Sequence, residues 1–136
     1  MNMAFKPESL TVRVLAQADV NELARIEAFV DASSQGTAFH RPAWVLSVGK
    51  ACGHEWRYLL AEDHEGQLQG ILPLNLIHSG LFGRALVSSG FAVGGGILSD
   101  NDRAIQLLAE EAWRFAESNS FPTIELRGGP VPDGQW

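Results

Sequence analysis

Two neighbouring apolar segments near the middle of the chain constrain its fold more than any other feature. Residues 55–61 alternate between apolar and polar side chains, and residues 68–77 form a longer apolar run. The polar stretch between them contains Gly66, as a turn does. This pattern predicts an antiparallel hairpin, so the chain must build a sheet. Pro73 lacks an N–H group, and we expect it at an edge or a bulge of that sheet.

Periodic patterns on both sides of the hairpin predict the other elements of the fold. Apolar residues recur at helical or strand spacing, and several of the helical patterns begin at a capping residue or a proline. The third helix is expected to follow the capping-box pattern of Ser99 and Asp102 and to end near Asn119. The remaining expected elements are strands at 10–15, 84–88 and 123–127 and helices at 19–31 and 42–52. A mixed sheet flanked by helices, an α/β (α+β) fold, satisfies this order.

Composition and charge exclude several classes of function. The formal net charge of -6 gives no general attraction for nucleic acid, so we expect none to bind to this domain alone. Cys52 is the single cysteine, and we interpret it as a small core residue. There is no paired metal-ligand spacing, no leader pattern and no apolar run long enough to span a bilayer. We therefore expect a cytoplasmic protein without a membrane span, a metal or a cofactor.

Four short motifs occur in order along the chain: TAFHRPAW at 37–44, GILPL at 70–74, LFGRALVS at 81–88 and ELR at 125–127. Together they resemble the amino-terminal part of FemAB-related proteins, especially the subgroup associated with PEP-CTERM and exopolysaccharide systems. The order of elements is also the one used by the GNAT acyltransferase fold. The resemblance implies a GNAT-like mixed, largely antiparallel sheet flanked by helices in the order β-α-α-β-β-β-α-β. This domain would cover residues 1–127, and 128–136 would be a truncated linker or tail.

The family resemblance also implies a function. Its members look like two GNAT-type domains in tandem, and the better-known ones move an amino acid from aminoacyl-tRNA onto a cell-wall precursor. The first domain helps to form the acceptor cleft, and the second carries much of the donor site. This chain would then belong to an aminoacyl- or acyltransferase of cell-envelope or exopolysaccharide biosynthesis and be inactive alone. Its partners would be a second GNAT-like domain or another copy, and a cell-wall or polysaccharide precursor.

A small GNAT acetyltransferase is one alternative, and the sequence argues against it. Such enzymes hold the pyrophosphate of acetyl-CoA with a Q/R-x-x-G-x-G/A loop at the start of a helix. Gly94 and Gly96 have the G-x-G spacing, but Phe91 stands at the basic or amide position. Asp100 and Asp102 would place negative charge at the same helix start and repel the pyrophosphate. A non-catalytic binding module is the other alternative.

The best candidates for an acceptor site lie around the start of the second helix. Arg41 can grip a phosphate with two N–H groups, and Trp44 can stack on a sugar or a base. His40 is their neighbour in sequence. The alternative interpretation places Trp44 in the core and leaves His40 and Arg41 as a solvated helix start.

Three more cations complete the set of candidate substrate-binding residues, and no residue is predicted to be catalytic. Lys50 lies further along the second helix and could add positive charge. Arg84 and Arg127 are flanked by apolar strand residues, so both could point into a cleft. Each of these two arginines could instead lie on the outer face or pair with an acid such as Glu125.

Overall fold

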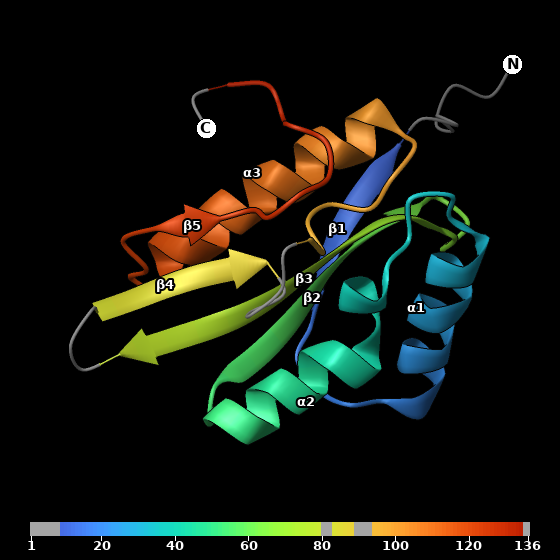
Figure 1. The fold of residues 1–136 in the computed structure, drawn as a ribbon. Helices are drawn as coiled ribbons and strands as arrows, with labels where there is room; N and C mark the ends of the chain where they lie inside the picture. The colour runs from blue at the N-terminus through green and yellow to red at the C-terminus, as the bar shows by residue number, and fades with distance from the viewer. Residues whose placement is uncertain (1–8, 80–82, 89–93, 135–136) are drawn as a thin grey trace, which may run out of the picture.

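The computed structural model describes residues 9–79, 83–88 and 94–134, and the helices and strands in them follow the predicted order (Figure 1). One short 3-10 helix, η1, is additional. The elements are β1 (Leu10–Leu15), α1 (Val20–Ala32), η1 (Ala38–His40), α2 (Pro42–Cys52), β2 (Glu55–Asp63), β3 (Leu68–Ser79), β4 (Gly83–Ser88), α3 (Asp102–Ser118) and β5 (Ile124–Glu125).

The strands form one mixed sheet in the order β1-β2-β3-β4-β5. β1 to β4 pair antiparallel, and β5 pairs parallel with β4 through only two residue pairs. β2 and β3 make the predicted hairpin. At its turn, the side chain of Asp63 accepts hydrogen bonds from the backbone N–H groups of Glu65 and Gln67 at 2.9 and 3.0 Å. The predicted α+β class with a largely antiparallel sheet is confirmed.

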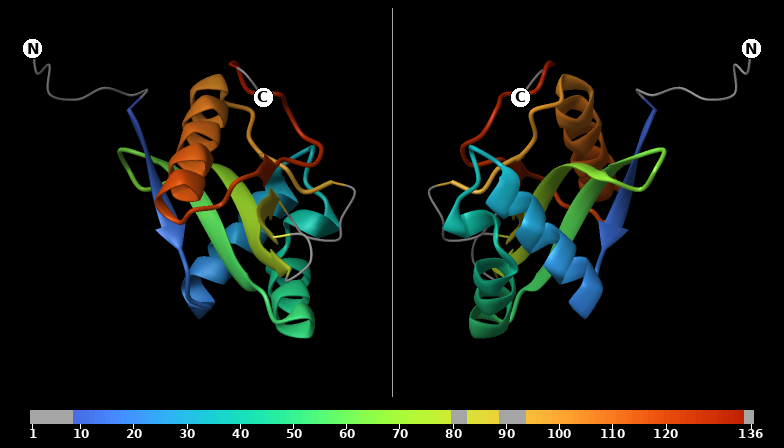
Figure 2. Two further views of the ribbon diagram at one scale, coloured as in Figure 1. Left: turned by 90° about the vertical axis from the view of Figure 1, so that its left-hand side faces the viewer. Right: turned by 90° about the vertical axis from the view of Figure 1, so that its right-hand side faces the viewer.

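Helices cover both faces of the sheet. α3 packs on one face, and α1 and α2 pack on the other (Figures 1 and 2). Because successive strand side chains point to opposite faces, β2 contributes to both cores. The core under α3 includes Leu59, Leu72, Leu74, Leu86, Leu108 and Ala112. The core under α1 and α2 includes Ile26, Val30, Val45, Tyr58, Leu60 and Ile71.

Pro73 lies in the central strand β3, and the register irregularity of the β2–β3 pair is at Ala61/Glu62, so the expectation of a sheet edge or a bulge at Pro73 is wrong. Pro73 pairs with Tyr58 of β2. The N–H of Ile71 points toward the path of β4, where it donates to Leu98 O at 3.0 Å. Pro73, two residues further on, presents its nitrogen to the same side. The described ladder of β4 ends at the Leu74–Ser88 pair, so no described β4 residue needs an N–H donor from Pro73.

The start of α3 differs from the predicted capping box. Asn101 is the N-cap, and its side chain accepts a hydrogen bond from Ala104 N at 3.0 Å. Ser99 instead donates its hydroxyl to Gln69 O at 2.6 Å and accepts from Asn101 N at 3.0 Å. The hydroxyl of Ser99 thus ties the chain to β3, and the helix begins only after it. The first helix starts as predicted, with Asp19 accepting from Glu22 N.

The tail returns along α3. Asp133 N donates to the side-chain oxygen of Gln106 at 3.1 Å, and the Gln106 amide nitrogen donates to Asp133 O at 3.4 Å. Pro132 is buried, and Gly129 packs directly against the backbone of Ile97. Residues 128–134 therefore pack on the domain, although their sequence has no periodic pattern.

Candidate functional site

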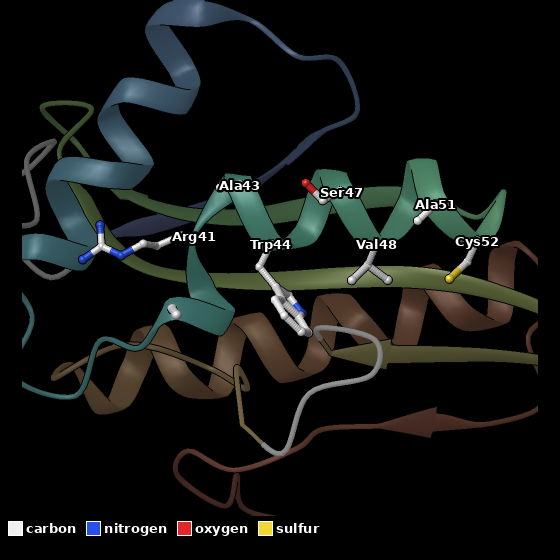
Figure 3. Close-up of a pocket in the computed structure, with 8 residues that line it drawn as sticks. Arg41, Ala43, Trp44, Ser47, Val48, Ala51 and Cys52 are labelled. Carbon is white, nitrogen blue, oxygen red and sulfur yellow. The ribbon is translucent and has the colours of Figure 1, made fainter.

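An apolar groove runs along α2 (Figure 3). Its volume is about 590 Å³. Trp44, Val48 and Cys52 project from one side of α2 at a spacing of four residues. Trp44 is half-buried, and its ring stands nearly perpendicular to that of Phe39 at a centroid distance of 5.0 Å. The residues that line this α2 groove are Ala38, Arg41, Ala43, Trp44, Ser47, Val48, Ala51 and Cys52.

Trp44 and Cys52 fare differently against their structural interpretations. Trp44 is half-buried: it packs against the core under α1 and α2 and also lines the groove. Cys52 is exposed at the end of α2, so its assignment to the core is wrong. Cys52 lies on the same side of α2 as the buried Val48, but it is the last residue before the terminating Gly53, where the buried stripe of the helix has ended.

Arg41 lies at one end of the groove, but its charge is directed to α1. Its guanidinium pairs with Glu27 and with Asp31, the latter at 2.8 Å. These carboxylates raise the pKa of Arg41 above its ordinary value. In Figure 3 the guanidinium points away from Trp44. The two carboxylates carry more charge than the one guanidinium, so a phosphate would meet no net positive charge at this group.

His40 is buried behind the groove and makes structural hydrogen bonds. The backbone N–H of Thr37 donates to His40 Nδ1 at 3.1 Å. Because Nδ1 accepts, the ring proton is on Nε2, which donates to Gly96 O at 3.0 Å. Burial lowers the pKa of His40 below its ordinary value, since the charged ring would lose solvation. His40 thus joins η1 to residues 94–98 as a neutral ring.

Tyr58 of β2 also holds His40 in place, and sequence analysis did not identify it as a residue of the site. Its hydroxyl donates to His40 O at 2.7 Å. Burial, reinforced by the charge of Glu27, raises the pKa of Tyr58. The alternation of β2 places Tyr58 among core residues, but the partner of its hydroxyl depends on tertiary packing.

Lys50 lies apart from Arg41 and Trp44. It lines a different hollow of about 450 Å³ at the end of α2, together with His54 and Trp56. Lys50 is exposed in the last turn of the helix, where a cation complements the negative end of the helix dipole. Lys50 therefore adds no positive charge beside Arg41 and Trp44.

The two strand arginines have structural partners outside the groove. The Arg84 guanidinium lies over the ring of Phe121 at 4.3 Å, and its Nη1 donates to Ser120 O at 3.3 Å, just after α3. Arg127 pairs with Glu125 at 3.1 Å, as its structural interpretation predicted. The backbone N–H of Arg127 also donates to Ser88 Oγ at 2.7 Å, which extends the short β4–β5 pairing.

The glycine segment before α3 is tightly packed. Leu98 and Ile71 exchange two backbone hydrogen bonds of 3.0 Å. A Cβ on Gly96 would lie 2.3 Å from Gly128 O, so this glycine permits a close backbone approach. Asp100 is exposed, and Asp102 lies in the first turn of α3. Phe91, at the expected basic position of the acetyl-CoA motif, lies outside the described residues.

Within 9–79, 83–88 and 94–134, no three His, Cys, Asp or Glu side chains come together in a way that could hold a metal ion. Across the described helices, none combines the length and the apolar character needed to cross a membrane.

Comparison with known proteins supports the fold and names no function. No family model matches the chain, and no curated protein matches it. Among solved structures, the chain is similar to a mutant of the BH1408 protein from Bacillus halodurans, with a TM-score of 0.54 and 17% sequence identity. The match covers 88% of this chain and 82% of that one. At this identity the likeness concerns the fold alone.

Proposed function

We propose that this chain is the acceptor-side, GNAT-like domain of a FemAB-like aminoacyl- or acyltransferase. It would bind a cell-wall or polysaccharide precursor in the cytoplasm and would transfer no group by itself. The order of elements and the single parallel strand pair after α3 support the GNAT-like part of this proposal. The four sequence motifs support the FemAB-like part.

The hydrogen bonding and charge at the start of α3 support most directly the proposal that this domain has no donor site of its own. Binding of a pyrophosphate at a helix start requires unoccupied N–H groups and a positive dipole end. Here the side chain of Asn101 occupies Ala104 N, and Asp102 adds negative charge to the first turn. Gly96 uses its carbonyl for His40 and packs against residues 127–128. An acyl-CoA donor therefore lacks a cradle among these residues.

The α2 groove supports acceptor binding. Its walls are mainly apolar, with Ser47 as the hydroxyl group along its length. Trp44 offers a flat surface for a ring of the precursor. Because Glu27 and Asp31 hold Arg41, we assign recognition mainly to Trp44 and less to the arginine.

Calorimetric titration with a nucleotide-linked cell-wall or polysaccharide precursor tests the acceptor role. Trp44→Ala should weaken binding about tenfold, or about 1.4 kcal/mol, because the stacking surface is lost. Lys50→Ala is the matched control, since Lys50 lies in a separate hollow, and it should leave binding unchanged. Equal effects of the two substitutions would contradict the assigned groove. Melting curves of both variants check that the fold is intact.

A second experiment separates the proposal from its alternatives. Acetyl-CoA should not bind, so a dissociation constant at or below roughly 100 μM, about -5.5 kcal/mol, would favour an ordinary acetyltransferase. Incubation with acyl-CoA and aminoacyl-tRNA donors should give no turnover by this chain. Activity should appear when a second GNAT-like domain is supplied. Precursor binding that never leads to transfer, with or without that domain, would favour the binding module.

A further inference from the structure

β1 offers the longest unpaired strand edge in the described part of the sheet. It ends the strand order, and both views of Figure 2 show it at the outside of the molecule. The opposite edge strand, β5, has only two residues. Proteins commonly protect exposed edges with charged side chains, proline or a bulge, because unpaired N–H and C=O groups recruit another strand. β1 has the sequence LTVRVL, with no proline and no bulge, and Arg13 is its one charged residue.

The side chains of β1 form an apolar row that the domain only partly covers. Leu10 and Val12 pack partly against the core under α3, whereas Val14, on the same row, is 42% exposed. Val20, at the start of α1, is 80% exposed. Val14 is thus one of the four large hydrophobic side chains that are exposed in residues 9–79, 83–88 and 94–134, whereas Val20 belongs to α1, on the other face of the sheet.

The charged side chain of β1 does not oppose the approach of another strand. Arg13 donates through Nη2 to Glu22 at 2.9 Å and through Nε to Glu62 at 3.0 Å. Arg25 also pairs with Glu62, at 3.0 Å. The charges of this group balance, and they lie on the face opposite to the apolar row.

We propose that β1 pairs antiparallel with β1 of a second copy of this chain, around a two-fold axis at Val12. In this register Leu10 of each copy faces Val14 of the other, and Thr11 faces Arg13. The apolar row then continues across the axis, and Val14 gains an apolar neighbour. Such an interface uses the same patch on both copies, as two-fold symmetry requires, and joins the two sheets into one.

Other registers of the β1–β1 pair are less favourable. Centring the axis on Arg13 would place the two Arg13 side chains directly opposite each other, and like charges there are destabilising. Centring it on Thr11 would pair only residues 10–12 of β1. A shift by one residue would set apolar side chains opposite polar ones, because strand side chains alternate. The Val12 register is therefore the specific prediction.

This interface is independent of the proposed transferase role. No residue of β1 lines the α2 groove, so a dimer can form whether or not the groove binds a precursor. The experiment below measures association and is unaffected by the absence of a substrate.

Light scattering of the whole chain at high micromolar concentration tests the dimer. The expected mass is twice the 14.8 kDa of one chain. Val14→Lys should raise the dimer dissociation constant about tenfold or more, because it places a charged ammonium against Leu10. Val131→Lys is the matched control, since Val131 is 85% exposed in the tail, and it should leave association unchanged. A monomeric wild-type chain would overturn the proposal, as would a dimer equally sensitive or insensitive to both substitutions.

Cysteine cross-linking tests the register. In a Cys52→Ser background, Val12→Cys should form a disulfide-linked dimer with an added oxidant such as diamide. Directly opposite residues have Cα atoms about 4.5–5.5 Å apart, within the range that a disulfide spans. Thr11→Cys in the same background should not cross-link, because its neighbour across the axis is Arg13. Cross-linking of Thr11→Cys but not of Val12→Cys would refute the Val12 register, and cross-linking of neither would refute β1 pairing.

Discussion

Replacing His40 tests whether this histidine is a structural ring or a ligand-binding group. His40 is 4% exposed, and its ring joins Thr37 N to Gly96 O. His40→Ala would leave both backbone groups without their partner. Of these two bonds only the one to Gly96 O is buried, and a buried polar group left unpaired costs about 1–3 kcal/mol, so the expected loss of unfolding free energy is about 1–3 kcal/mol. This is a large part of the roughly 5–15 kcal/mol that stabilises a domain.

The same ring predicts the direction of the pH dependence. Burial lowers the pKa of His40 in the folded chain, whereas the unfolded value is about 6.5. Between the folded and unfolded pKa values, the unfolded chain binds more protons, so stability rises with pH there. The full contribution is present above about pH 6.5 and is lost as the pH falls below it, with a slope of at most about 1.4 kcal/mol per pH unit.

Urea unfolding at pH 7.5, 6.5 and 5.5 measures both effects. His40→Gln keeps one hydrogen-bonding group and does not titrate, so it should unfold more easily at pH 7.5 and lose less stability on acidification. His78→Gln removes an exposed histidine and should behave like the wild type. If His40→Ala changed stability by less than about 0.5 kcal/mol, or if His40→Gln kept the wild-type pH slope, the structural role would be refuted.

Three further substitutions test the packing around the site, each by urea or thermal unfolding. Arg84→Ala should lower the free energy of unfolding by about 1–2 kcal/mol, because it removes the contact with Phe121 and the hydrogen bond to Ser120 O. Arg103 is an exposed cation on α3, and Arg103→Ala should change the free energy of unfolding by no more than about 0.5 kcal/mol. Gly96→Ala should lower the free energy of unfolding by about 1–3 kcal/mol, because the new Cβ would overlap Gly128 O. Gly94→Ala is its control: the new Cβ would lie 3.6 Å from Phe39, and the free energy of unfolding should hardly change. Gln106→Ala should release the tail and speed its proteolysis, without a comparable effect from Glu117→Ala, an exposed carboxylate further along α3.

The sequence predicted the order of elements well, because each long element carries its own periodic pattern. The hairpin of β2 and β3 and the amphipathic α3 need no tertiary information. Capping was less predictable. Ser99 and Asn101 both suit an N-cap, and the choice between them depends on the bond from Ser99 to Gln69 O of β3.

The candidate site was less predictable than the fold. His40, Arg41 and Trp44 lie within five residues of one another in sequence. Their side chains nevertheless point in three different directions, because the chain turns between η1 and α2. His40 enters the interior toward Gly96, Arg41 reaches Glu27 on α1, and Trp44 forms the groove wall. Such partners are distant in sequence, and no local pattern in one sequence identifies them. The exposure of Cys52 was missed because an apolar helical stripe does not reveal where the core ends.

The short parallel pair of β4 and β5 has a consequence for how the domain folds and opens. β2, β3 and β4 follow one another closely, so pairing them closes short loops, whereas β5 joins only after α3 has crossed the sheet. We expect β5 to add late and, with two residue pairs, to open before the rest of the sheet. Its departure would remove the Arg127 bond to Ser88 and lift residues 128–129 from Gly96 and Ile97. Local opening at this edge would thus expose to solvent the backbone that holds His40, while the antiparallel strands remain folded.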